Sequence, residues 1–270
     1  MIPVFLFVVL LSSCTLERKL GQEFLKLAPE INIELISPEL LFKYNHKGEQ
    51  IRGFDSLTSS QQDSALYADS RFIRNVDDSI YLERYVNSFI DELRAIGFRV
   101  FIDGMVDSLF RIMPQSYVVN MAQVQLDEYI SPFEDSEPIG DSIFYKTYEL
   151  NALDASSWLE VNKYNAVKPV KTVLYSSFTA SDGFSGSFIM NDMNIRYQYK
   201  IDSLKLNDIY DLASFSGRQD ANYLFDYFMN QYIAIHLPES YEILGYLHYN
   251  RSRRSFNFTD EDKFEVLQSK

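Results

Sequence analysis

Histidines and neighbouring carboxylates are the side chains of this sequence that could carry acid–base or metal chemistry. The three histidines, His46, His236 and His248, stand far apart, and none has a second histidine at a ligand spacing such as His-x-x-x-His. Asp127-Glu128 falls on an expected strand, where adjacent side chains point to opposite faces. Glu134-Asp135 falls in an expected solvated loop. We therefore expect no metal site and no cofactor.

Local motifs of several catalytic machineries are absent from the sequence. The chain has no Gly-x-Ser-x-Gly or Ser-x-x-Lys motif, as several serine hydrolases have, and no glycine-rich phosphate-binding loop. We expect a protein that is not an enzyme. A glycan-active hydrolase stays open as an alternative, because a glycosidase needs only two carboxylates that folding brings together.

Serine hydroxyls that follow an aspartate are a recurrent feature. Asp-Ser occurs eight times, whereas ordinary abundances of the two residues give about two such pairs by chance. Asp-Ser-aliphatic is similar to the O-glycosylation sequon of secreted proteins in the Bacteroides group of bacteria. The resemblance implies glycans on the six serines that precede a small or aliphatic residue: Ser56, Ser64, Ser79, Ser108, Ser142 and Ser203. The alternative is that Asp-Ser caps helices and starts turns, as expected at Asp78-Ser79 and Asp202-Ser203.

Arg251, Arg253 and Arg254 form a basic cluster in an acidic sequence. They fall in the expected turn of a hairpin over residues 246–258. The cluster could contact an acidic partner or phosphorylated lipid headgroups. The alternative is a turn that only keeps the protein soluble.

The N-terminus has the pattern of an export and anchoring signal. Residues 2–11 form an apolar run that is too short for a bilayer, which needs about 20 residues, but suits a signal peptide. Leu11-Ser12-Ser13-Cys14 resembles a bacterial lipobox. The resemblance implies cleavage after Ser13 and acylation of Cys14 with diacylglyceryl and palmitate-type chains, which would anchor the protein. No Lys or Arg precedes the apolar run, which departs from the signal-peptide pattern, and an ordinary signal peptide or a short strand with an incidental cysteine is the alternative.

Composition limits the classes of function that remain. The formal net charge is −13, which argues against nucleic-acid binding because that needs a basic stripe. Cys14 is the only cysteine, so an intramolecular disulfide is excluded. Tyr and Phe are abundant, with 19 and 21 copies, and both favour strands.

Periodicity along the chain predicts the elements that would position these residues. Apolar residues recur at helical spacing from Ser79 to Ile96, with Gly97 as the C-terminal cap. Residues 117–129 read as a long strand with a bulge near Asn120, and residues 131–140, with two prolines, as an acidic loop. Further expected elements are strands at 31–35, 98–102, 144–162 and 195–201, a hairpin of 172–178 with 184–189, and helices at 206–213 and 220–235 that could be one kinked helix. We expect an α+β fold: a mainly antiparallel sheet with two long helices packed on one face, plus a C-terminal hairpin.

The segment 81–129 resembles the core of small periplasmic lipoprotein domains. That group includes curli-secretion lipoproteins, auxiliary lipoproteins of transport systems and penicillin-binding-protein activators. The shared pattern is a helix that ends in Gly-Phe and a following valine-rich strand, here Gly97-Phe98-Arg99-Val100, and then Tyr117-Val118-Val119. Ordinary helix capping is the alternative source of this pattern. The resemblance implies a binding domain without catalytic residues.

These observations define the expected organisation and function. We expect a signal peptide over 1–13, a lipidated tether over 14–28, an α+β domain over 29–237 and a C-terminal hairpin extension over 238–270. The expected function is that of a non-enzymatic outer-membrane lipoprotein, an accessory or binding component with an envelope protein partner in assembly, secretion or transport. In enterobacterial lipoproteins an Asp after the lipidated cysteine retains the protein at the inner membrane, so by resemblance Thr15 implies the outer membrane. Surface export in the Bacteroides group resembles an acidic run after the cysteine, and its absence here implies the periplasmic face. The alternative is a surface-exposed lipoprotein that binds a glycan or a host ligand, and the sequence leaves the oligomeric state open.

Overall fold

The protein has an α+β fold in a computed structural model that describes residues 16–102, 115–164, 172–191, 194–241, 244–259 and 264–267. The helices are α1 (Leu16–Leu27), η1 (Ala28–Glu30), η2 (Gly48–Gln50), η3 (Phe54–Ser56), α2 (Ser59–Asp69), η4 (Ile73–Asn75), α3 (Asp78–Ile96) and α4 (Leu206–His236). The strands are β1 (Asn32–Ile36), β2 (Leu41–Asn45), β3 (Arg99–Ile102), β4 (Ser116–Ile139), β5 (Ser142–Lys163), β6 (Thr172–Ser181), β7 (Gly183–Asn191), β8 (Asn194–Asp202), β9 (Tyr246–Asn250), β10 (Ser255–Thr259) and β11 (Glu265–Leu267). The expected class is therefore confirmed.

The main sheet is mostly antiparallel by paired residues, and it also contains a parallel part. Its strand order is β11-β6-β5-β4-β1-β3, and β2 also pairs with β4. Strands β4, β5, β6 and β11 are antiparallel neighbours, whereas β1 pairs in parallel with both β3 and β4, and β2 pairs in parallel with β4. The parallel part arises because α3 carries the chain back from β2 to β3, and a helical crossover lets the next strand run in the same direction. Two further sheets, β7-β8 and β9-β10, have two strands each.

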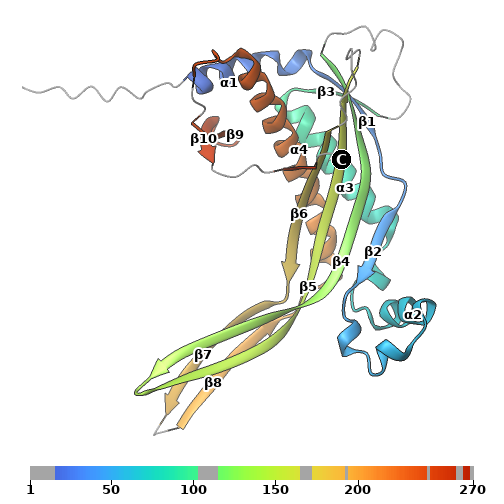
Figure 1. Ribbon diagram of the computed structural model, residues 1–270, viewed down its shortest axis with the longest axis vertical. Helices are drawn as coiled ribbons and strands as arrows, with labels where there is room; N and C mark the ends of the chain where they lie inside the picture. The colour runs from blue at the N-terminus through green and yellow to red at the C-terminus, as the bar shows by residue number, and fades with distance from the viewer. Residues whose placement is uncertain are drawn as a thin grey trace, which may run out of the picture.

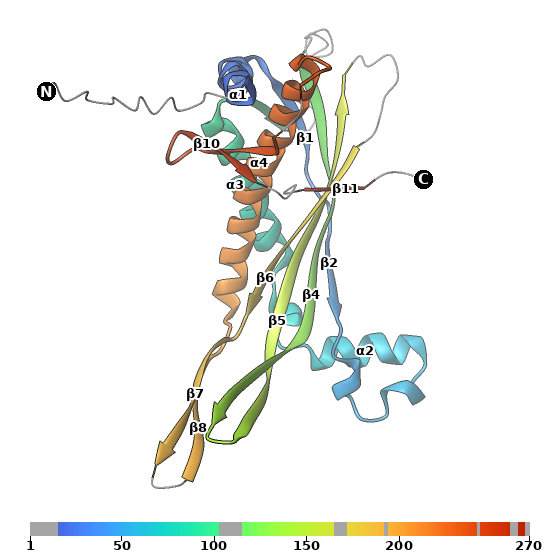
Figure 2. The same cartoon turned by 60° about the vertical axis from the view of Figure 1, so that its left-hand side comes forward.

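The two longest helices, α3 and α4, lie side by side on one face of the main sheet (Figures 1 and 2). Helix α3 begins one residue before the predicted Ser79 and ends at the predicted Ile96: the Asp77 side chain accepts a hydrogen bond from the Ile80 N–H, and Gly97 follows the last turn with φ of +124°. The two helical segments expected at 206–213 and 220–235 form one helix, α4. Gly217 permits close packing of this helix, because a Cβ there would lie 2.2 Å from the Tyr85 carbonyl oxygen on α3.

A buried carboxylate holds α4 against both α3 and the sheet. Asp220 is fully buried and accepts hydrogen bonds from the Tyr85 hydroxyl at 2.7 Å, the Ser157 hydroxyl at 2.7 Å and the Ser176 hydroxyl at 2.5 Å. Burial raises the pKa of Asp220 to about 6, although the three hydroxyl donors oppose the shift. Helix α4, helix α3 and strands β5 and β6 thus share one polar junction inside an otherwise apolar core.

Segments at both ends of the described chain also pack on α4. Residues expected in a tether form α1, whose Leu20 and Phe24 belong to the core. The C-terminal hairpin β9-β10 docks through Asn230, which hydrogen-bonds both the N–H and the C=O of Leu247. Strand β11 joins the edge of the main sheet beside β6. Residues on either side of the expected 29–237 domain are therefore integral to the fold that the structure describes.

Strands β4 and β5 extend far beyond the body and form one half of an arm (Figure 2). They pair from Tyr117↔Lys163 to Ile139↔Ser142, with the predicted bulge confirmed as a register shift between Met121 and Gln123. The expectation of a loop at 131–140 is wrong, because these residues continue β4. Pro132 and Pro138 are tolerated there because β2 stops pairing at Glu128 and leaves the outer edge of the distal β4 unpaired among the described strands.

Hairpin β7-β8 forms the other half of the arm and packs against the distal β4-β5 ribbon (Figure 1). The predicted hairpin of residues 172–178 with 184–189 is wrong: β6 pairs with β5, and β7 pairs with β8. The chain changes sheets at Asp182, whose N–H donates to the Asn151 carbonyl and whose carboxylate accepts from Asn151 and Leu204. These contacts end β6 and direct the chain outward into the arm.

Candidate functional site

An aromatic core holds the two hairpins of the arm together. The ring centroids of Phe133 and Phe184 lie 4.3 Å apart, those of Tyr148 and Tyr199 4.4 Å apart, and Tyr197 packs edge-on against Phe188 at 4.7 Å. Alternation along each strand places these rings on the facing sides of the hairpins. Each such pair contributes roughly 0.5–1.5 kcal/mol beyond the area that it buries. These ring contacts therefore stabilise the packing of the two hairpins against each other.

One polar contact and one glycine complete the interior of the arm. The Tyr197 hydroxyl donates to Asp135 at 2.8 Å. Burial, followed by this hydrogen bond and the charge of Asp135, raises the pKa of Tyr197 to about 12. Gly186 lets the Tyr197 ring lie against the backbone, since a Cβ at Gly186 would be 2.4 Å from the hydroxyl oxygen. The arm thus has a specific interior and is not merely two ribbons in contact.

Large apolar side chains are exposed near the far end of the arm. Ile143 is 58% exposed, Tyr145 72% and Met190 63%, and Ile189 is also exposed. Ile143 and Tyr145 alternate with the inward Phe144 along β5, so they project from the outer side. Ile189 alternates with the inward Phe188 on β7, so the arm exposes apolar side chains on both of its outer sides. We refer to Ile143, Tyr145, Ile189 and Met190 as the arm tip.

A network of buried charges fixes the base of the arm to the body. The Lys47 ammonium donates to Glu128 at 2.6 Å and to the Asn151 side chain at 2.9 Å. Asn151 in turn donates through its N–H and side chain to Asp182, whose other oxygen accepts from the Leu204 N–H at 2.8 Å. Asp182 before β7 and Leu204 after β8 are therefore connected by hydrogen bonds to Asn151 on β5. Lys47 connects Asn151 in turn to Glu128 on β4.

Glu128 is the best-satisfied carboxylate of this network. Besides Lys47, its oxygens accept from the backbone N–H groups of Arg71, Phe72 and Ile73 at 2.8, 2.9 and 3.1 Å. Burial alone would raise the pKa of Glu128, but the hydrogen bond from Lys47 and these backbone N–H donors together outweigh it, and the pKa lies below its ordinary value. The pKa of Asp182 is lowered in the same way, with burial opposed by Asn151, Leu204 and Arg71. Both side chains are thus held ionised where the arm leaves the body.

The described serines of the expected glycosylation sites do not belong to the aromatic core of the arm. Cys14 and Ser108 are not among the described residues. Ser56, Ser64, Ser79, Ser142 and Ser203 are all exposed, but they are spread over separate elements and form no single site. The N-cap of α3 is Asp77 and that of α4 is Lys205. Capping therefore does not account for Asp78-Ser79 or Asp202-Ser203.

Most of the other candidate residues form ion pairs or hydrogen bonds within the protein. Arg251 pairs with Glu92 on α3 at 3.0 Å, whereas Arg253 and Arg254 are exposed in the β9-β10 turn. His46 pairs with Asp127 at 2.7 Å and His248 with Asp226 at 2.6 Å, while His236 donates to the Tyr232 carbonyl. Asp127 and its neighbour Glu128 point to opposite faces of β4, as expected. The described residues contain no group of three or more His, Cys, Asp or Glu placed to hold a metal ion.

The arm tip is the feature that sequence reasoning missed. Two of its residues, Ile143 and Tyr145, closely follow Pro138 and Gly140, which the sequence presents as part of a loop. A signal was present in the alternation of Phe144, Lys146 and Tyr148 with Ile143, Tyr145 and Thr147, which favours a strand with two apolar faces. Only the position of hairpin β7-β8 decides which of these faces is covered.

Comparisons with known proteins do not assign the chain to a family. No family model and no curated protein matches the sequence. A solved structure described as a neuraminyllactose-binding hemagglutinin homologue from Helicobacter pylori is similar over 77% of this chain and 90% of that chain, with 10% sequence identity and a TM-score of 0.30. Similarity at this level carries no argument about fold or function. Among the described helices, none is long and apolar enough to cross a membrane.

Proposed function

We propose that the protein is a lipid-anchored, non-enzymatic accessory protein of the outer membrane that faces the periplasm and binds an envelope protein through the arm tip. The exposure of Ile143, Tyr145 and Met190 at the end of a rigidly based arm is the observation that carries this proposal. The described strand from Ser131 to Ile139 reaches about 30 Å at roughly 3.4 Å per residue. This length allows contact with a partner well away from the body.

The position of α1 supports the anchored orientation. Leu16, the first residue of α1, follows Cys14 closely in the sequence, and α1 lies at the end of the molecule opposite the arm (Figures 1 and 2). A lipid on Cys14 would therefore hold the body near the membrane and direct the arm away from it. Radiolabelled palmitate should be incorporated into the wild-type protein and not into Cys14→Ser. Protease treatment of intact cells should leave the protein uncut if it faces the periplasm, and digestion without lysis would contradict that placement.

A matched pair of variants tests the role of the arm tip. Ile143→Ser with Tyr145→Ser removes apolar surface from the arm, and Ile80→Ser with Tyr67→Ser removes the same residue types from exposed positions of the body. Affinity capture of the lipidated protein from membranes should recover a stoichiometric partner with the wild type and the body variant, and lose it with the arm variant. Equal recovery with both variants would refute a partner site at the arm tip.

A glycan-binding role is the second candidate, because one sheet face carries an aromatic and amide surface. Trp158 and Tyr175 lie 4.9 Å apart on the face opposite α3 and α4. On the same face Gln123 donates to Gln125, which donates to Asp127, at 2.6 Å each. Trp158 is the only tryptophan, so a glycan that stacks on it should change the intrinsic fluorescence. An unchanged spectrum across a panel of envelope and host oligosaccharides would count against this role.

Glycosylation at Asp-Ser remains a proposal, supported by the exposure of Ser56, Ser64, Ser79, Ser142 and Ser203. It predicts mass heterogeneity in the native protein. The heterogeneity should vanish when these five serines and Ser108 are replaced by alanine. A single sharp mass for peptide plus lipid would contradict the proposal.

A further inference from the structure

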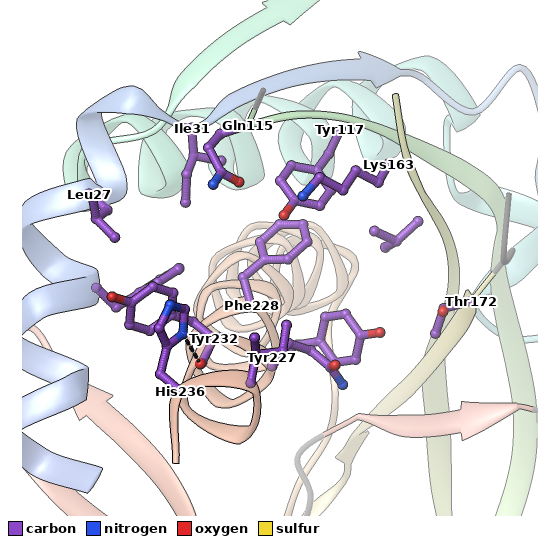
Figure 3. Close-up of a pocket in the computed structure, with 14 residues that line it drawn as sticks. Leu27, Ile31, Gln115, Tyr117, Lys163, Thr172, Tyr227, Phe228, Tyr232 and His236 are labelled. Atoms are coloured by element: carbon purple, nitrogen blue, oxygen red, sulfur yellow. Dashed lines mark hydrogen bonds between the residues drawn. The ribbon is translucent and has the colours of Figure 1, made fainter. Parts of the chain in front are cut away.

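A groove of about 600 Å³ opens between α1, the start of β4 and the last turns of α4 (Figure 3). Its volume lies within the range of small-molecule sites, about 300–1,000 Å³. Gln115, Tyr117 and Lys163 line one side, and Tyr232 and His236 line the opposite side. The groove lies in the body at the α1 end, so it is separate from the arm tip.

The walls of the groove are predominantly apolar and aromatic. Tyr117 and Phe228 have ring centroids 4.5 Å apart, and Phe24 packs against Tyr232 at 5.6 Å. Tyr232 also stacks on His236 at 4.0 Å. Because neighbouring rings hold these side chains in place, the groove does not need to form anew when a ligand enters.

The charge of the groove differs from that of the protein. The chain has 38 acidic residues and a net charge of −13, yet the described residues that line the groove include no Asp or Glu. Among the described lining residues, Lys163 supplies the one ammonium group, and its Nζ lies 5.6 Å from the centre of the Tyr117 ring. Within the described part of the chain Lys163 makes no ion pair, whereas Lys43 and Lys47 both pair with carboxylates.

We propose that this groove binds a long-chain fatty acid, with its carboxylate on Lys163 and its acyl chain against the rings of Phe24, Tyr117 and Phe228. An ammonium group that makes no ion pair with a described residue, in a groove whose described lining has no Asp or Glu, attracts an anionic head and disfavours a cationic one. An acyl chain fits the apolar walls, where burial of each methylene is favourable. This proposal does not depend on the role of the arm.

Displacement of a fluorescent fatty acid tests the proposal directly. Residues 15–270, which retain every described residue and carry no acyl chain, are loaded with cis-parinarate and titrated with palmitate, hexadecanol or hexadecylamine. Palmitate should displace the probe, hexadecanol should be at least about tenfold weaker because it lacks the charged hydrogen bond, and hexadecylamine should not compete. Equal competition by palmitate and hexadecylamine, or no displacement by palmitate, would overturn the proposal.

Two matched pairs of variants locate the ligand. Lys163→Glu should weaken palmitate binding at least about tenfold, whereas Lys146→Glu should bind like the wild type, since Lys146 packs on Tyr148 in the arm with a similar geometry. Ile235→Glu places a carboxylate at the exposed lip of the groove and should also weaken binding, whereas Ile143→Glu should not. If Lys163→Glu and Lys146→Glu bind palmitate equally, the ligand does not occupy this groove. Ile143→Glu should instead lose the envelope partner, so the two proposals can fail independently.

Discussion

The body and the arm use the same aromatic residue types in opposite ways. In the body, Tyr81, Tyr85 and Phe89 are completely buried between α3, α4 and the sheet. In the arm, Phe133, Phe184 and Tyr197 are only half-buried, and the arm tip is exposed. The difference arises because helices cover one face of the body sheet, whereas the arm consists of two hairpins with a single interface. The body thus buries its aromatic core completely, whereas the arm leaves apolar side chains exposed.

The buried carboxylates of the two regions also differ. Asp220 in the body accepts hydrogen bonds from hydroxyl groups alone, and burial keeps its pKa raised. Glu128 at the base of the arm accepts from an ammonium group and three backbone N–H groups, and its pKa is lowered. The carboxylate at the base of the arm, Glu128, is therefore paired with a positive charge. The carboxylate between the helices and the sheet, Asp220, accepts hydrogen bonds from neutral groups only.

The largest expected effect is on the stability of the arm's base. Glu128→Ala leaves the Lys47 ammonium buried without its carboxylate and three backbone N–H groups without an acceptor. We expect the free energy of unfolding to fall by about 3–5 kcal/mol. The neighbouring Asp127→Ala changes a carboxylate whose partner, His46, is exposed, and should cost far less. Chemical denaturation measures both variants, and equal losses would show that the network does not join the arm to the body.

The pH dependence of stability should separate the two carboxylates. The pKa of Asp220 is about 6 when folded and 3.8 in its ordinary environment, so the folded state binds the proton more tightly. Because of this carboxyl group, the free energy of unfolding of the wild type should decrease by roughly 3 kcal/mol as the pH rises from 3.8 to about 6. Asp220→Asn removes this slope, so the variant should gain stability relative to the wild type between pH 4 and 6.

Asp182→Asn should behave in the opposite sense. The pKa of Asp182 is lowered on folding, so its contribution to stability is present above the ordinary pKa of 3.8 and is lost as the pH falls below it. Unfolding curves measured at several pH values check both slopes. If the free energy of unfolding of Asp220→Asn and that of Asp182→Asn changed with pH in the same way, the contrast between the two regions would be contradicted.

A smaller effect is expected from loosening the arm core. Tyr197→Ala removes ring contacts to Phe188 and Tyr148 and the hydrogen bond to Asp135, at a cost of about 2 kcal/mol for a half-buried aromatic. Hydrogen exchange should accelerate in β7 and β8 and stay unchanged in α3 and α4, because the body core does not contact this ring. Acceleration throughout the molecule would mean that arm and body unfold as one unit.

The same contrast explains what the sequence could and could not predict. Helix α3 was predictable because its apolar stripe, Asp77 cap and Gly97 end are local signals. The distal β4 was not, because Pro132 and Pro138 favour a loop unless the neighbouring edge is unpaired. The separation of β6 from β7 depends on Asp182 and its contacts with Asn151 and Leu204, which are distant in sequence. The candidate site is built from such long-range contacts, and no motif marks it.

A photo-crosslinking residue placed at the arm tip tests the central claim most directly. Benzoylphenylalanine at Tyr145 is compared in living cells with the same residue at Tyr67, which is also exposed but lies on α2. The account predicts one discrete crosslinked envelope protein from position 145, lost when Ile143→Ser is added, and none from position 67. No crosslink at position 145, or the same product from both positions, would contradict a partner-binding arm.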